Sequence, residues 1–381
     1  MIASGHNLRL VTPLALVRFQ QGESPLGGGC SSFGLVFEPE TIDRLPTPAL
    51  VVDKPALDRN IATMSEALPG PRLRPHVKAF KCTALAERLV ASGHRNFTAA
   101  TIKEVEGLAI AGLGHDILLA NEVLDANRLG ALLGPETRIT VAVDSSETIT
   151  AAVDGGLAEV LIDIDVGLKR CGANVVDAGR LADEARRQGL TVRGVMGYEG
   201  HLMMIDDPEQ KAEMVAKSMA RLAQAHEGVG GEVISAGGTG TYHLNQVATE
   251  IQAGSYLLMD TDYNRLGLPF EIGVSVLASV ISVNSRGWFV IDAGLKSLGM
   301  DHGLPVAAGS PTNSEVEGEV WYCSDEHTTL KPSGDGVLPV VGDRYRLLPA
   351  HLDPTVSCHR QMWLVDGSEV VDRWAVDLRH W

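Results

Sequence analysis

The sequence predicts a (β/α)8 TIM barrel followed by a C-terminal all-β domain. From about residue 50 to 262, short β-branched runs alternate with longer amphipathic runs, a pattern typical of a parallel sheet with crossover helices. About eight such βα units in roughly two hundred residues is the size of a TIM barrel. After Val274 the pattern changes to short strands with tight turns. We therefore expect residues 46–273 to form the barrel and residues 274–381 the β domain.

Each element is predicted from its own run of residues. The barrel strands are expected at Leu73–Lys78, Asn96–Thr101, Asp116–Asn121, Arg138–Asp144, Glu159–Val166, Val192–Glu199, Glu232–Gly237 and Ile251–Asp260. Apolar residues at three- and four-residue spacing predict helices between them. These helices are Thr83–Ala91, Ile102–Ala111, Ser145–Asp154, Val175–Gln188 and Pro208–Ala225. The β-domain strands are expected at Val276–Val283, Trp288–Asp292, Glu317–Cys323, Arg344–Leu348, Gln361–Val365 and Val370–Val376.

Composition and charge narrow the class of protein. The chain has 381 residues, 45% apolar and 21% charged, which are globular values, and it has no apolar run of about eighteen residues that could span a membrane. The net charge of −16 disfavours binding to nucleic acid or anionic lipid. Five scattered cysteines without a C-x-x-C pair argue against a disulfide framework and fit a cytoplasmic protein. Residues 1–45 are expected to form a partly irregular leader.

Lys78 closes the first expected barrel strand. A side chain at that end projects into the mouth of the barrel, where TIM-barrel active sites lie. Desolvation among apolar neighbours is expected to lower the pKa of Lys78 and make it a nucleophilic amine. On position alone, a surface lysine at a loop entrance is the commoner alternative. Other polar residues at strand ends favour the nucleophile.

Two donor-rich segments follow the seventh strand and interrupt the eighth. Ser235 to Thr241 contains Gly238 and Thr239, and Gly254-Ser255-Tyr256 follows. Glycines let backbone amides approach a phosphate, and hydroxyls add donors. A phosphate site between strands seven and eight is common in this fold, although a glycine-rich turn is otherwise an ordinary βα loop. Together the two segments predict a phosphate site.

Ionisable residues also follow the fifth and sixth strands. Arg170 can hold an anionic ring oxygen or a carboxylate, and Tyr198 or His201 can carry protons. For any one of them, a satisfied core residue or a surface ion pair is the plainer alternative.

The pair His351-x-Asp353 is a candidate metal site. Extended residues two apart face the same way, so an imidazole and a carboxylate would converge on one point. His nitrogen with Asp oxygen suits a divalent cation such as Zn²⁺ or Mn²⁺. A hydrogen-bonded turn is the plainer alternative, and Glu326-His327 and Cys358-His359 are rival ligand sources.

Taken together, these residues resemble the D-threonine aldolase and D-serine dehydratase family, the fold-type III pyridoxal-phosphate enzymes related to alanine racemase. The resemblance covers about residues 45 to 381. Its marks are Arg74-Pro-His-Val-Lys78, Gly167-Leu-Lys-Arg170-Cys-Gly172, Gly197-Tyr-Glu-Gly-His201, Gly237-Gly-Thr-Gly240, Gly254-Ser-Tyr256 and Pro349-Ala-His351-Leu-Asp353-Pro354. It implies a homodimer whose active site lies between one barrel and the partner's β domain.

The resemblance also implies roles for individual residues. Lys78 is the Schiff-base lysine, and Tyr198 and His201 meet the reacting substrate, with His201 the first candidate base. His351 and Asp353 bind the metal, which is Mn²⁺, Mg²⁺ or Zn²⁺. The residues expected to contact pyridoxal phosphate are Lys78, Arg170, Tyr198, Ser235, Gly238, Thr239, Gln252, Gly254, Ser255 and Tyr256.

Three parts of the sequence distinguish the chain within this family. The dehydratases typically show His-x-Cys at the metal pair, so Asp353 favours the aldolases. The family's Lys-Thr-His-Lys segment reads Lys78-Ala-Phe80-Lys81 here, and Gln252 replaces an arginine of the alanine racemases. The resemblance therefore implies metal-dependent retro-aldol cleavage of D-3-hydroxy amino acids. A D-serine or 3-hydroxy-D-aspartate dehydratase, a racemase and a non-catalytic pyridoxal-phosphate carrier are the alternatives.

Overall fold

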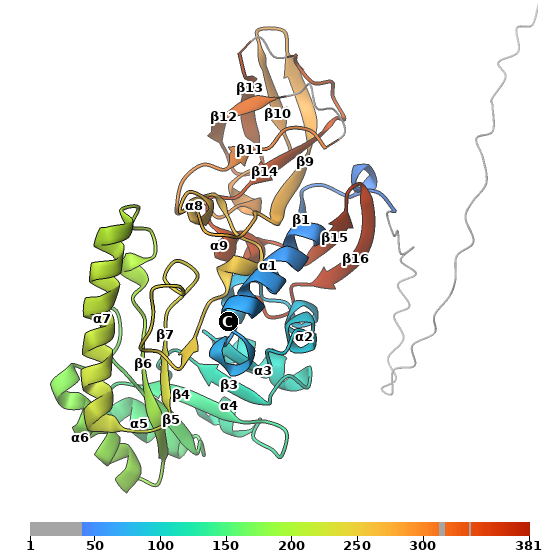
Figure 1. Ribbon diagram of the computed structural model, residues 1–381. Coiled ribbons are helices and arrows are strands. Elements are labelled where there is room, and N and C mark those ends of the chain that lie inside the picture. Colours follow the sequence, from blue (N-terminus) through green and yellow to red (C-terminus); the bar gives the residue numbers. More distant parts are fainter. Residues whose placement is uncertain (1–39, 312–316, 335–336) are drawn as a thin grey trace, which may run out of the picture. The chain divides into compact units, whose positions relative to one another are not determined.

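The computed structural model describes residues 40–311, 317–334 and 337–381 (Figure 1). Most of the expected leader, up to residue 39, lies outside these residues. Seven parallel strands form one curled sheet in sequence order, with each strand bonded to the next. They are β2 (Asn96–Ala99), β3 (Asp116–Leu119), β4 (Ile139–Val143), β5 (Glu159–Asp163), β6 (Thr191–Gly197), β7 (Val233–Ala236) and β8 (Glu250–Ile251). The α/β barrel with a C-terminal β domain is thereby confirmed.

The segment before Lys78 closes the barrel without forming a regular strand. Leu73 bridges Ile251 of β8, and His76 bridges Thr98 of β2. The prediction of a strand over Leu73–Lys78 was therefore wrong, because Pro75 has no N–H for a ladder and the 3-10 helix η3 (Val77–Ala79) begins directly afterwards. Lys78 consequently lies in a helical turn at the carboxyl edge of the sheet.

The last barrel strand is also shorter than expected. The strand predicted over Ile251–Asp260 ends at Ile251, because the chain turns at Gly254 into the 3-10 helix η5 (Ser255–Leu257). A strand would have carried this segment across the sheet. The turn instead leaves it at the mouth of the barrel.

The five predicted helices are confirmed, with ends within a few residues of the prediction. They are α2 (Thr83–Ala91), α3 (Ile102–Ile110), α5 (Ser146–Asp154), α6 (Val175–Arg187) and α7 (Pro208–Val229). Capping explains some of their starts: Thr101 and Glu104 form a capping box before α3, and Asp207 caps α7. Helices α1 (Lys54–Ala67), α4 (Asn127–Gly130), α8 (Thr261–Asn264) and α9 (Leu352–Cys358) were not predicted. In the part of the chain that the structure describes, no helix is long and apolar enough to cross a membrane.

A second, mixed sheet contains nine strands, eight of them from the C-terminal part. These eight are β9 (Val274–Asn284), β10 (Trp288–Ile291), β11 (Val306–Ala307), β12 (Gly318–Cys323), β13 (Thr328–Pro332), β14 (Arg344–Leu348), β15 (Gln361–Asp366) and β16 (Glu369–Ala375). The ninth is β1 (Ala49–Asp53), which runs parallel to β15 and antiparallel to β9. Figure 1 shows β1 beside β15 and β16. The first described strand therefore lies in the mixed sheet, and the chain returns to that sheet after the barrel.

Arg74 organises a buried ion network within the barrel. It is 1% exposed, and its Nε lies 2.8 Å from Glu250 and its Nη1 3.2 Å from Asp116. Arg193 of β6 adds a second contact to Asp116, at 3.0 Å. Burial acts to raise the pKa of Asp116, but the two arginines outweigh it and the net pKa is lowered. Arg74 thus ties the irregular closing segment to β3 and β8.

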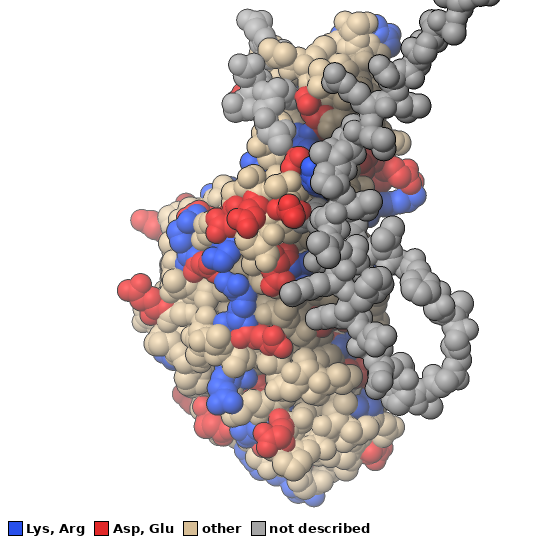
Figure 2. Space-filling model, turned by 90° about the vertical axis from the view of Figure 1, so that its right-hand side faces the viewer, with Lys and Arg blue, Asp and Glu red and all other residues tan. Residues whose placement is uncertain are grey.

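On the face seen in Figure 2, the described surface charges do not form a large patch of one sign. There the described Lys and Arg side chains are interspersed with Asp and Glu.

We predict that Arg74→Met lowers the free energy of unfolding by about 3–5 kcal/mol, because it leaves buried carboxylates without their cation. Arg59→Ala is the control, since Arg59 pairs with Glu271 in solvent, with the two side chains 55% and 54% exposed. Urea denaturation followed by circular dichroism measures both variants. Equal stability of the two variants would contradict the role given to Arg74.

Candidate active site

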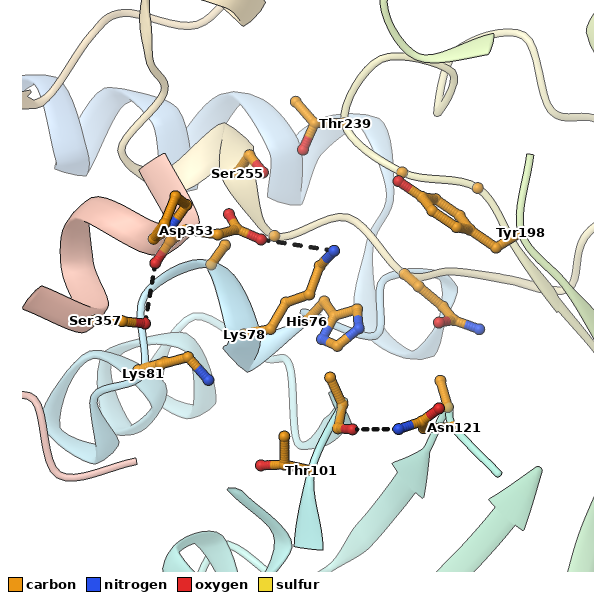
Figure 3. Close-up of a pocket in the computed structure, with 18 of the residues that line it drawn as sticks. His76, Lys78, Lys81, Thr101, Asn121, Tyr198, Thr239, Ser255, Asp353 and Ser357 are labelled. Carbon is orange, nitrogen blue, oxygen red and sulfur yellow. Dashed lines mark hydrogen bonds and ion pairs between the residues drawn. The ribbon is translucent and has the colours of Figure 1, made fainter. Parts of the chain in front are cut away.

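A cavity of about 500 Å³ opens at the carboxyl edge of the barrel sheet, where α9 of the β domain faces it (Figure 3). This volume suits a cofactor or small ligand. Nine of the residues singled out in the sequence line it. They are Lys78, Arg170, Tyr198, Gly238, Thr239, Gln252, Gly254, Ser255 and Asp353. Four others do not line it: His201, Ser235, Tyr256 and His351.

Lys78 lies near the middle of the cavity, between Asp353 and Tyr198 (Figure 3). Its Nζ is 3.6 Å from Asp353 Oδ2 and 5.8 Å from the centre of the Tyr198 ring. Burial acts to lower the pKa of Lys78, but the charge of Asp353, with a smaller contribution from Tyr198, outweighs it and the pKa is raised. The lowering expected from desolvation alone was therefore wrong, because no sequence pattern indicated that Asp353 lies beside the amine. The amine is held as an ammonium ion.

The two glycine-rich segments form one wall of the cavity. A Cβ on Gly254 would lie 2.4 Å from the carbonyl oxygen of His76, so only glycine fits there. Gly237 has φ +80°, a conformation that also favours glycine. Next to them, the Thr239 hydroxyl oxygen accepts a hydrogen bond from the backbone N–H of Tyr256 at 3.0 Å. The wall therefore presents backbone and hydroxyl groups at close range.

Glu199 anchors this wall from behind, a role that the sequence did not reveal. It is fully buried, and it accepts hydrogen bonds from the Gly237 N–H at 3.2 Å and from the Thr241 hydroxyl at 2.7 Å. Burial raises the pKa of Glu199 despite these bonds. Its place in the motif Gly197-Tyr-Glu-Gly-His201 was the one available signal.

Two of the expected cofactor contacts act behind the cavity. Ser235 Oγ accepts a hydrogen bond from Gln252 Nε2 at 2.9 Å, so Ser235 orients a side chain that does line it. Tyr256 is fully buried, with its ring 5.6 Å from that of Phe270. Phe80, which departs from the family's pattern, is also fully buried and does not line the cavity.

The two candidate proton carriers, Tyr198 and His201, lie in different places relative to the cavity. Tyr198 lies across the cavity from Asp353, and Arg170 packs over its ring at 5.6 Å. Burial raises the pKa of the Tyr198 phenol, so it is protonated at neutral pH. His201 is exposed and lies next to Gly167. The structure therefore brings Tyr198, but not His201, to Lys78.

The metal pair lies at the start of a helix. The prediction of an extended segment over His351 and Asp353 was wrong, because α9 begins at Leu352 and Pro354 fits its first turn. Asp353 points to Lys78, whereas His351 Nδ1 bonds to Asp301 Oδ2 at 2.6 Å. Burial acts to raise the pKa of Asp301, but the bond from His351 helps to outweigh it and the net pKa is lowered.

The rival ligand sources lie elsewhere. Glu326 pairs with Lys296 in solvent, and His359 is buried with Nε2 2.9 Å from the Ser297 carbonyl oxygen. Neither pair lines the cavity.

The segment after β16 completes the cavity, which no sequence pattern predicted. His380 and Trp381 line it, and Trp381 is 89% exposed. The segment is anchored because Asp377 accepts a hydrogen bond from the Thr83 N–H at 3.0 Å, and the Leu378 N–H bonds to the Lys81 carbonyl oxygen. Lys81 itself pairs with the buried Glu104.

A lysine at the mouth of an α/β barrel, facing glycine-rich segments and a β domain, defines the class of alanine racemase-type proteins. Residues 52–262 match the family model "Alanine racemase, N-terminal domain", and residues 273–365 match "Putative serine dehydratase domain". The chain belongs to this family of fold-type III pyridoxal-phosphate enzymes.

Three relatives place the chain more closely. A D-threonine aldolase of Arthrobacter sp is 33% identical, with 89% of this chain and 94% of the relative covered. The crystal structure of a D-threonine aldolase from Filomicrobium marinum is 31% identical with a TM-score of 0.83, covering 89% and 97%. A D-threo-3-hydroxyaspartate dehydratase from Delftia sp. HT23 is 28% identical with a TM-score of 0.78, covering 90% and 100%. A mutant of a D-threo-3-hydroxyaspartate dehydratase has been solved in a metal-free form.

We predict that Asp353→Asn lowers the pKa of Lys78, because the carboxylate charge that stabilises the ammonium ion is removed. The neutral, reactive amine then appears at lower pH. Trinitrophenylation of Lys78 as a function of pH, read by peptide mass spectrometry, measures this in protein freed of metal and carbonyl ligands. Asp353→Glu keeps the charge and is the control. An unchanged profile in Asp353→Asn would show that Asp353 does not govern the amine.

Proposed function

We propose that this protein is a lyase, dependent on pyridoxal phosphate and a divalent metal, that cleaves D-3-hydroxy amino acids by a retro-aldol reaction. D-Threonine would give glycine and acetaldehyde, with low specificity for the side chain. The observation that carries the proposal is the carboxylate of Asp353, 3.6 Å from Lys78 Nζ, at the place where the dehydratases typically have a cysteine. Similarity to D-threonine aldolases supports it.

The cavity fits a phosphorylated aldehyde. The close approach at Gly254 leaves its wall without side-chain bulk, and the hydroxyls of Thr239 and Ser255 lie on that wall. Such a surface suits a phosphate group. Lys78 offers the amine that can join to an aldehyde, and Arg170 offers a cation on the Tyr198 side. These residues would hold pyridoxal phosphate.

In the proposed retro-aldol cleavage, the residues of the cavity have separate roles. When bound, pyridoxal phosphate accepts the electron pair of the cleaved Cα–Cβ bond. His351 and Asp353 would hold the divalent metal, whose charge would favour loss of the proton from a hydroxyl group of the substrate. Tyr198, rather than the more distant His201, is placed to hold a proton at the cavity, and its packing with Arg170 fixes its ring. Gln252 is neutral, so it adds no positive charge to the floor of the cavity.

A dehydratase is the second candidate function. Similarity to the D-threo-3-hydroxyaspartate dehydratase supports it, because that relative covers as much of this chain as the aldolase does. D-Serine distinguishes the two reactions, since a dehydratase converts it to pyruvate. A non-catalytic carrier would bind the cofactor and turn over no D-amino acid.

We further propose a homodimer whose active site lies at the interface, acting in the cytoplasm. Its barrel domain would span residues 46–273, with β1 contributed to the mixed sheet, and its β domain residues 274–381. The resemblance of the sequence to this family implies such an assembly. Exposed aromatic side chains on β12 also support it: Trp321 is 58% and Tyr322 is 53% exposed.

Borohydride reduction of the cofactor-loaded protein is expected to label Lys78, because its amine is central in the cavity while Lys81 is paired with Glu104. Peptide mass spectrometry locates the label. Lys81, which lines the same cavity, is the internal control. A label on Lys81, or no label, would refute the proposed cofactor site.

Asp353→Ala is expected to reduce cleavage of D-threonine by more than about a hundredfold while leaving the cofactor absorbance intact. Metal catalysis supplies several kcal/mol, and this substitution removes a ligand. Acetaldehyde and glycine are assayed with and without EDTA. Ser357→Ala, on the same helix and also lining the cavity, is the control and should stay active. Full activity of the wild-type protein in EDTA would rule out the metal.

A further inference from the structure

We infer that Asp301 is a positioning residue for the metal site. Its carboxylate accepts a hydrogen bond from the Nδ1–H of His351, which leaves Nε2 of His351 as the ligand nitrogen. The inference rests on the proposed function. Asp301 Oδ2 lies 2.6 Å from His351 Nδ1, and both residues belong to the β domain. The sequence did not indicate Asp301, which precedes His351 by an entire hairpin and more.

The chemistry of the two partners fixes the direction of this bond. A carboxylate without a proton only accepts hydrogen bonds, so the nitrogen that faces it must carry the proton. A neutral imidazole has one N–H and one lone pair, so Nε2 of His351 then carries the lone pair. A carboxylate on the second nitrogen also fixes the tautomer and the ring orientation of a histidine ligand. Asp301 thus prepares His351 as a ligand before any metal arrives.

Asp301 is held where it can perform this task. The Gly299 N–H donates to Thr355 Oγ1 at 2.8 Å, and the Thr355 hydroxyl donates to the His351 carbonyl oxygen at 2.7 Å. A Cβ on Gly299 would lie 2.3 Å from Pro354, so the segment before Asp301 packs directly on α9. The backbone segments that carry the carboxylate and the imidazole are therefore tied together through Thr355.

One face of the His351 ring is covered by a second histidine. The ring of His302 stacks on it at 4.0 Å between centres and 16° between planes. His302 Nδ1 bonds to Asp262 Oδ2 of α8 at 2.7 Å. Asp260, the N-cap of α8, accepts a hydrogen bond from the Leu352 N–H at 2.8 Å. Helix α8, which follows the last barrel strand, thus packs against the segment that carries the imidazole.

A direct three-ligand site is the rival arrangement. One ligand atom from each of Asp301, His302 and His351 lies within 4.8 Å of the others. The stacking argues against it, because the lone pairs of an imidazole lie in its ring plane, and nearly parallel rings at 4.0 Å cannot both aim at an ion about 2 Å away. The bonds to Asp301 and Asp262 also occupy one nitrogen of each ring.

Mn²⁺ affinity of the cofactor-loaded protein without substrate tests the inference, with free Mn²⁺ measured by electron paramagnetic resonance. Asp301→Ala should weaken binding by about 10–100-fold, the usual effect of losing such a partner. Asp301→Asn keeps the shape and removes the charge, so it should also weaken binding. His302→Phe keeps the stacked ring and removes the nitrogens, so affinity should persist. Asp325→Ala, an exposed acid of the same domain, is the matched control.

Each result decides between the inference and its rivals. If the wild-type protein fails to bind Mn²⁺, the metal of the proposed function is refuted. If His351→Ala abolishes binding while both Asp301 variants keep it, only the role of Asp301 is overturned. Pulsed electron paramagnetic resonance should show the nitrogen of one histidine bound to Mn²⁺. Two histidines, or a loss of affinity in His302→Phe, would favour the three-ligand site. Borohydride labelling of Lys78 in each variant verifies that the site is folded.

Discussion

The contact between the ammonium group of Lys78 and the carboxylate of Asp353 is the interaction on which the site depends. Lys78 comes from the turn that closes the barrel, and Asp353 from the first turn of a helix in the β domain. The position of Lys78 or of Asp353 alone would not show whether Lys78 is a reactive amine or an ordinary surface lysine. Placed 3.6 Å apart in one cavity, they combine an amine with the charge that sets its protonation. The remaining residues of the cavity are arranged around this pair (Figure 3).

The sequence predicted the barrel because its signals are local. Residues with a period of two or of about 3.6 reveal which face of an element is buried. Polar residues at strand ends could be grouped for a similar reason, since the carboxyl ends of parallel strands meet at one edge. Arg170, Tyr198 and Gly254 therefore line the cavity as predicted.

The failures have a common physical cause, which is contact between distant segments. The closing segment before Lys78 bonds to both β2 and β8 without being a strand, and α9 is too short to show a periodic pattern. Asp301 and Trp381 reach the site through tertiary packing alone. Several motif residues also proved to support the site from behind: Arg74 balances buried carboxylates, and Glu199 holds the glycine-rich wall.

These distant contacts also explain why the barrel and the mixed sheet must fold together. Strand β1 precedes the barrel but lies between β15 and β9, so the mixed sheet is incomplete without the N-terminal segment. Asp377 returns to cap Thr83 at the start of α2. A catalytic group needs its supporting contacts to fix it within a fraction of an ångström. Lys78 lies in η3 at the edge of the barrel sheet, and Asp353 lies in α9 of the β domain. Their spacing is therefore set by these crossing segments, and a separated barrel would keep the amine but lose the carboxylate that governs it.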